Sequence, residues 1–205
     1  MWKLLRIMIV IATNNGMEFL PRLLKSLESA KEKILIADTG STDPVFLEYL
    51  KTLKNVAYCD GGWSPGAYKY AYDNYKDDWY FFMHDSMEVK DINFLDNFKQ
   101  HDVCTWLYFP IFFDDPTDEA VCRATYPLIS PIGIFGPIFY AKRSALDKIT
   151  LEIPNTLNEA HNFERGLACA FHSAGIKINH IHEMIEDKII NDGYPDLKKW
   201  KPQRP

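Results

Sequence analysis

The residues best suited to chemistry in this sequence lie at the end of one hydrophobic stretch. Residues 79–83 are bulky aromatic and apolar side chains, typical of a buried strand, and His84, Asp85, Ser86 and Glu88 follow closely. Open α/β sheets bind ligands at the carboxyl ends of their strands. Oxygen donors with one imidazole suit Mn²⁺ or Mg²⁺ better than a soft metal. The stretch predicts a ligand or metal site, although Asp85 and Ser86 could equally form a turn after a core strand.

Strand-like and helix-like segments alternate through the first half of the chain. Strands are predicted at 4–12, 34–37, 56–58 and 79–83, with helices at 17–29, 45–53 and 67–75 between them. Ser41, Thr42 or Asp43 can cap the second helix, and Pro44 suits its first turn. This alternation is the signature of a parallel, right-handed α/β sheet.

The second half of the chain has a less regular pattern. The predicted elements are a short helix at 91–98, a strand at 103–113 followed by an acidic turn at 114–116, a strand at 138–140, a helix from Arg143, a helix at 157–173 and a strand at 176–181. Prolines and glycines break up segment 127–140, which is unsuited to a central strand and could line a pocket. The chain from 194 onward resembles a tail or linker.

Composition and charge narrow the class of protein. A chain of 205 residues with 47% hydrophobic and 25% charged residues suits a single globular domain. A net charge of −5 without a basic cluster argues against nucleic-acid binding. Apolar run 7–12 is too short to span a bilayer, and no signal-peptide pattern is evident. The four scattered cysteines predict reduced thiols and a cytoplasmic protein, with neither a zinc site nor a disulfide framework.

Three motifs resemble those of family 2 glycosyltransferases. Residues 9–15 (IVIATNN) resemble the first strand of that family, and residues 36–43 (IADTGSTD) resemble its second-strand motif, the most specific of the three. Residues 82–86 (FMHDS) resemble the D-x-D region in the variant that begins with His. The small size and linker-like end also resemble a domain of the multidomain glycosyltransferases of chlorella viruses, which would imply the host cytoplasm and further domains in a longer protein.

The resemblance implies a fold and an activity. The fold would be of the GT-A type, a Rossmann-like α/β domain with a mostly parallel central sheet flanked by helices, over residues 1–193. Residues 1–100 would form the nucleotide-sugar-binding half and 101–193 the acceptor-binding half, with 194–205 as a tail. The implied activity is metal-dependent, inverting transfer of a hexosyl or deoxyhexosyl group from a nucleotide-sugar, expected to be a UDP-sugar, to a carbohydrate acceptor.

The resemblance also assigns donor-binding residues. Thr13, Asn14 and Asp38 would contact the base and ribose of the donor. Asp85 would hold the Mn²⁺ or Mg²⁺ that bridges the diphosphate, and His182 would supply a distal metal ligand. From the residues alone, Asp38 could instead cap the turn before the second helix, and a histidine at a strand end is often structural. Trp63, in a Gly-rich loop, is a candidate for stacking on a sugar.

The general base is implied by position. Glu164 corresponds to the second acid of a family acid pair, whereas Phe163 stands in place of the first; Glu159 and His161 are near enough in sequence to replace Glu164. Ser86 replaces the last acid of the D-x-D motif. These departures keep a second hypothesis open, a GT-A-like module that binds nucleotide-sugar or glycan without turnover. A nucleotidyltransferase is disfavoured, because residues 13–16 lack a Gly-rich phosphate loop with a basic residue.

Overall fold

The computed structural model describes residues 6–91, 93–110, 116–183 and 194–199. The strands are β1 (Ile7–Thr13), β2 (Lys33–Asp38), β3 (Val56–Tyr58), β4 (Trp79–His84), β5 (Met87–Val89), β6 (Val103–Pro110), β7 (Ile132–Ile134), β8 (Phe139–Lys142), β9 (Asn179–Glu183) and β10 (Leu197–Lys199). The helices are α1 (Leu20–Ser26), α2 (Pro44–Thr52), α3 (Trp63–Asn74), α4 (Leu95–Phe98), α5 (Pro116–Thr125), α6 (Arg143–Leu146) and α7 (Leu157–Ser173).

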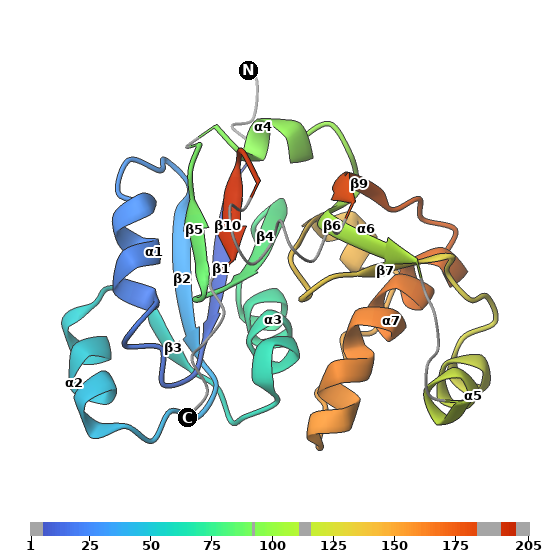
Figure 1. Cartoon of the computed structure of the whole chain (residues 1–205), viewed down its shortest axis with the longest axis horizontal. Coiled ribbons are helices and arrows are strands. Elements are labelled where there is room, and N and C mark those ends of the chain that lie inside the picture. The colour runs from blue at the N-terminus through green and yellow to red at the C-terminus, as the bar shows by residue number, and fades with distance from the viewer. Residues whose placement is uncertain (1–5, 92, 111–115, 184–193, 200–205) are drawn as a thin grey trace.

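One mixed sheet runs through the molecule (Figure 1). Within the described part of the chain it has eight strands in the order β3-β2-β1-β4-β8-β6-β7, with β9 also paired to β6. Strands β3, β2, β1 and β4 are parallel, whereas β8 is antiparallel to β4 and to β6. Strands β5 and β10 form a separate antiparallel pair. The largely parallel α/β sheet flanked by helices is the architecture that the sequence predicts.

The parallel half follows the predicted alternation of strands and helices. β3 has the predicted bounds, and β1, β2 and β4 differ from the predicted strands by a few residues. The Asp43 carboxylate accepts a hydrogen bond from the Val45 N–H at 2.9 Å and caps α2, with Pro44 in the first turn as predicted. In the second half, α7 also has its predicted bounds.

The second half contains elements that the sequence pattern did not indicate. Helix α5 begins at Pro116, where only a turn was predicted, and residues 111–115 lie outside the described part of the chain. The broken segment 127–140 forms β7, which was not predicted, and the start of β8, which overlaps the strand predicted at 138–140. Leu197–Lys199 form β10, although a linker was expected there, because Leu197 is fully buried and pairs with Val89 of β5.

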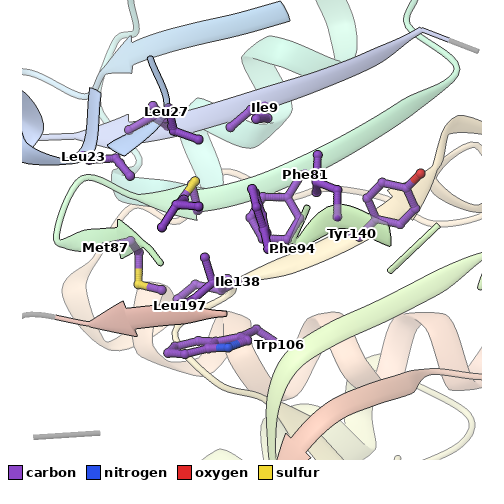
Figure 2. Close-up of a cluster of buried hydrophobic side chains, with 14 of the residues drawn as sticks. Ile9, Leu23, Leu27, Phe81, Met87, Phe94, Trp106, Ile138, Tyr140 and Leu197 are labelled. Atoms are coloured by element: carbon purple, nitrogen blue, oxygen red, sulfur yellow. The ribbon is translucent and has the colours of Figure 1, made fainter. Parts of the chain in front are cut away.

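Alternate residues of the central strands enter two hydrophobic cores, one on each face of the sheet. On one face, Ile9 and Phe81 pack with α1, α2 and α4. Figure 2 shows this core, in which Met87, Trp106 and Leu197 lie together below β4. On the other face, Phe82 packs with α3, α6 and α7. Both faces of the sheet are therefore covered, as parallel strands require.

No helix in residues 6–91, 93–110, 116–183 and 194–199 combines the length and apolar character needed to cross a bilayer.

Truncation of Leu197 tests whether β10 belongs to the folded core. Leu197→Ala should lower the free energy of unfolding by about 2–5 kcal/mol, because it leaves a cavity in a closely packed site. Val45→Ala, at a side chain that is 64% exposed, should change it by less than about 0.5 kcal/mol. Urea denaturation measures both variants. A near-zero effect of Leu197→Ala would mean that residues 194–199 do behave as a tail.

Candidate functional site

The carboxyl ends of β1, β2 and β4 meet at one edge of the sheet. Thr13 pairs with Asp38 across β1 and β2, and Ala12 pairs with His84 across β1 and β4. A cavity of about 160 Å³ opens at this edge. It is lined by Ala12, Thr13, Asn14, Thr39, Trp63, Ser64, His84 and Asp85. The cavity lies where parallel α/β sheets bind ligands.

Asp85 is the acidic group of this cavity. The Thr13 hydroxyl donates a hydrogen bond of 2.6 Å to Asp85 Oδ2. A Cβ atom at Gly16 would lie 2.0 Å from the same oxygen, so the loop after β1 can approach Asp85 only with glycine there. Burial raises the pKa of Asp85 to about 6, and hydrogen bonds from Thr13 and from the N–H groups of Ser86 and Asn14 oppose this shift.

His84 and the start of α3 also line the cavity. The Ser64 hydroxyl lies 2.9 Å from His84 Nε2. Burial, and secondarily the charge of Lys199, lower the pKa of His84 to about 3, so the imidazole is neutral at physiological pH. Trp63, the predicted stacking residue, also lines the cavity and is 40% exposed. An exposed indole beside neutral polar groups offers a surface for an aromatic or sugar ring.

The predicted base- and ribose-binding residues lie on neighbouring loops. Asn14 Nδ2 donates to the Thr39 carbonyl at 3.1 Å, which ties the loops after β1 and β2 together. The Asp38 carboxylate accepts hydrogen bonds from the Ser41 hydroxyl and, at 3.3 Å, from the Ser41 N–H. Asp38 therefore holds its own turn, the structural role that the sequence left open. Its contact with a ribose remains a prediction.

Glu164 projects from α7 toward the loop before β8. Its Oε1 accepts a hydrogen bond of 3.0 Å from the Gly136 N–H. Burial raises the pKa of Glu164, and this shift is opposed by the charge of Lys199, by the Gly136 N–H and by Arg165. A carboxylate with a raised pKa is a stronger base, which suits the predicted role.

The two alternatives to Glu164 differ in what the structure shows of them. Glu159 is exposed, and its carboxylate accepts the Asn155 N–H at 2.7 Å while its own N–H donates to the Thr156 hydroxyl at 3.2 Å. These contacts make Glu159 part of the helix cap. The side chain of His161 lies outside the described part of the structure. The assignment of the base to Glu164 remains a prediction.

The Tyr68 hydroxyl is influenced by both acids of the site. Tyr68 is fully buried in α3. Burial raises its pKa well above the usual value, the charges of Glu164 and Asp85 add to the shift, and Ser64 opposes it. The acid at the end of β4 and the acid on α7 therefore both act electrostatically on this α3 side chain.

His182 lies against the segment that precedes β10. Its Nε2 is 3.1 Å from Asp196 Oδ1, and its ring stacks on Tyr194 with centroids 4.6 Å apart. Asp196 Oδ1 also accepts the Trp106 indole N–H at 3.3 Å. His182 is not among the described residues that line the cavity, so the structure does not bring it together with Asp85. Its role as a distal metal ligand remains a prediction.

The cavity offers a divalent cation one carboxylate. Asp85 is a hard oxygen donor, and Ser86 follows it where a second acid would strengthen the site. Among the described residues, no group of three or more His, Cys, Asp or Glu side chains is placed to hold a metal. Magnesium is often held by one or two carboxylates together with substrate phosphates. Asp85 therefore fits a cation that takes most of its ligands from a bound diphosphate and water.

Sequence reasoning missed two residues that line the cavity, Thr39 and Ser64. Thr39 stands inside the recognised second-strand motif, so that motif could have indicated it. Ser64 was not singled out, and it reaches the cavity from the start of α3.

Comparison with solved structures places the fold. A mannosyltransferase from Pyrobaculum calidifontis, in complex with GDP-Man and Mn²⁺, is 13% identical and has a TM-score of 0.56, over 92% of this chain and 58% of that chain. Glucosyl-3-phosphoglycerate synthase from Mycobacterium tuberculosis is 12% identical with a TM-score of 0.51, over 89% of this chain and 74% of that one. S. aureus TarS is 12% identical with a TM-score of 0.50, over 90% of this chain and 37% of that one.

These similarities confirm the predicted GT-A type fold. The chain spans little more than half of the mannosyltransferase and little more than a third of TarS. At 12–13% identity the likeness shows the fold alone. No protein-family profile matches the chain, and no curated protein is significantly similar to it in sequence.

Replacement of Asp85 by asparagine tests the electrostatic state of the cavity. Because the folded-state pKa of about 6 exceeds the usual 3.8, ionisation of Asp85 lowers stability as pH rises through this window. In EDTA at pH 8, Asp85→Asn should therefore be more stable than the unaltered protein by roughly 2–3 kcal/mol, since one pKa unit corresponds to about 1.4 kcal/mol. At pH 4 the two proteins should be nearly equal in stability. Urea denaturation at both pH values measures this difference.

The control is Asp96→Asn, at a carboxylate that is 68% exposed, for which no pH-dependent gain is expected. A loss of stability in Asp85→Asn at pH 8 would show that the Thr13 hydrogen bond outweighs the burial of the charge.

Proposed function

We propose that this protein is a metal-dependent, inverting glycosyltransferase that moves a sugar from a nucleotide-sugar, expected to be a UDP-sugar, to a carbohydrate acceptor. The observation that carries the proposal is the cavity at the ends of β1 and β4, where Thr13, Asn14 and Asp85 converge. The GT-A fold supports it, because a protein of the same fold has been solved with GDP-Man and Mn²⁺. Fold alone does not fix function, so the site must carry the argument.

Donor binding is assigned to the loops after β1 and β2 together with Asp85. Thr13, Asn14 and Asp38 would contact the nucleoside, and Trp63 offers a ring surface beside them. Asp85 would hold Mn²⁺ or Mg²⁺, which neutralises charge on the departing diphosphate when it is bound. The raised pKa of Asp85 means that the carboxylate is charged above about pH 6, where it can attract a cation.

Glu164 is assigned the proton transfer. A general base takes the proton of the acceptor hydroxyl as that oxygen attacks the anomeric carbon, which is typically worth 10²- to 10⁴-fold in rate. Burial gives Glu164 the raised pKa that this role favours, while the Gly136 N–H fixes the direction of one carboxylate oxygen. Glu164 would be active in its ionised form, so transfer should decline as pH falls through that raised pKa.

A second cavity supports an acceptor site in residues 101–193. It has a volume of about 190 Å³ and is bounded by α5 and by the N-terminal half of α7, the helix that carries Glu164. Ile153 lines it and reaches Gly62, at whose position a Cβ atom would lie 2.5 Å from the Ile153 side chain. The contact brings this cavity to the loop that precedes Trp63 of the donor cavity. The viral relationship, the cytoplasmic location and further domains remain predictions.

Nucleotide binding by calorimetry tests donor recognition. A panel of UDP- and GDP-sugars is titrated with Mn²⁺ and with EDTA, and a donor is expected to bind more tightly with Mn²⁺. Asp85→Asn should remove the dependence on metal, because the carboxylate that attracts the cation is gone, whereas Asp96→Asn should retain it. If no nucleotide binds with metal present, the glycan-binding module without turnover becomes the better hypothesis.

Replacement of Glu164 by glutamine tests the base. Glu164→Gln should lower the transfer rate by about 10²- to 10⁴-fold while donor affinity is unchanged, because only the proton acceptor is lost. Glu159→Gln, at a residue of the same helix that lines the second cavity, tests the alternative base and should lower the rate far less than Glu164→Gln. Release of nucleoside diphosphate measures transfer. The opposite pattern, in which only Glu159→Gln is inactive, would move the assignment to Glu159.

A further inference from the structure

Lys199 brings a positive charge from the last described strand to the candidate site. Strand β10 pairs antiparallel with β5, and Lys199 lies opposite Met87, the second residue after Asp85. Directly opposed residues in such a pair have Cα atoms about 4.5–5.5 Å apart. The register therefore fixes the Lys199 backbone beside the chain that leaves the Asp85 loop.

The side chain of Lys199 reaches the loop that contacts Glu164. Its Nζ lies 4.7 Å from the Phe135 ring centroid. A Cβ atom at Gly136, whose φ is +59°, would lie 2.9 Å from the same Nζ. Gly136 also donates its N–H to Glu164. The ammonium and the candidate base thus approach the same glycine, which leaves room for both because it has no side chain.

The charge of Lys199 lies close to the candidate base. Its Nζ and the Glu164 carboxylate both approach Gly136, one at the position that a Cβ atom would contact and the other at the N–H. Burial lowers the pKa of Lys199, and the negative charge of Glu164 on α7 opposes that shift.

Among the described residues, the Lys199 ammonium forms neither an ion pair nor a hydrogen bond. Moving a charge away from water is unfavourable. The Glu164 carboxylate offsets part of that cost, and a bound anion would offset more of it. Asp85 alone supplies one negative charge to a divalent cation, so a diphosphate held there keeps an excess of negative charge. A cation on the chain itself would complete the neutralisation.

We propose that Lys199 binds the diphosphate of the nucleotide-sugar donor and stabilises the negative charge that this group gains as it leaves. This inference rests on the proposed function. In the transfer, the bond between the anomeric carbon and the diphosphate oxygen breaks, and its electron pair goes to that oxygen. The acceptor oxygen forms the new bond, and its proton goes to Glu164. Lys199 exchanges no proton and acts through its fixed charge and its hydrogen bonds.

Calorimetry on three variants tests this inference with binding alone. UDP and GDP are titrated in EDTA and with Mn²⁺, and uridine and guanosine serve as ligands without phosphate. The relevant ligand is whichever of UDP and GDP binds the unaltered protein. In both buffers, Lys199→Met should bind this diphosphate at least tenfold more weakly. Its affinity for the nucleoside should be unchanged. Lys199→Arg should bind the diphosphate within a few-fold of the unaltered protein, because it keeps the charge.

Lys198→Met is the matched control, since successive residues of a strand face opposite sides and Lys198 is the immediate neighbour. It should bind both ligands normally. Thermal melting checks that each variant is folded, and Lys199→Gln replaces Lys199→Met if the latter is not.

Three results would overturn the inference, and they can be told apart. If the unaltered protein binds the diphosphate and Lys199→Met binds it equally well, the role of Lys199 is refuted and the proposed function still stands. Equal losses for diphosphate and nucleoside would show that Lys199 only supports the shape of the cavity. No diphosphate binding by the unaltered protein, with Mn²⁺ present, would refute the proposed function and this inference together.

Discussion

Burial of β4 on both faces is the constraint on which the rest of the structure depends. Phe81 packs into one core and Phe82 into the other, while β1 and β8 pair with the two edges of the strand. Each such side chain contributes roughly 1.5–3 kcal/mol through burial, so a shift of the strand would expose both cores. The position of β4 in the sheet is therefore fixed, and so is its end at His84. Asp85 consequently lies at the edge of the sheet where the parallel strands have their carboxyl ends.

The stable scaffold holds several charges in positions that are unfavourable for folding. Asp85 and Glu164 are carboxylates with raised pKa values, and Lys199 is an ammonium with a lowered one. Shifted pKa values are common at sites that bind or transform ligands, because charged groups that stabilise a bound ligand often destabilise the protein when the ligand is absent. Their neighbours come from β1, β4, β5, α7 and β10, so the site depends on the packing of both halves of the chain.

The sequence predicts the parallel half well because its signals are local. Runs of apolar residues separated by helix-like periods set β1 to β4, and Asp43 with Pro44 sets the start of α2. The second half is harder to predict, since β7 and β10 owe their strand geometry to pairing with β6 and β5. Strand β3 is equally short, but it lies within the regular alternation of strands and helices, which made it recognisable. No such alternation surrounds β7 or β10.

The sequence by itself determined the order of strands and helices in the first half and the acid at the end of β4. It also contained the motifs that resemble a glycosyltransferase. Each of these features depends only on residues that are consecutive in the chain. Only the tertiary structure decided which distant groups meet. It placed Glu164 against Gly136, His182 against Asp196 and Lys199 beside the Asp85 loop. Those contacts depend on sheet order and strand register, which are set by the packing of the whole chain.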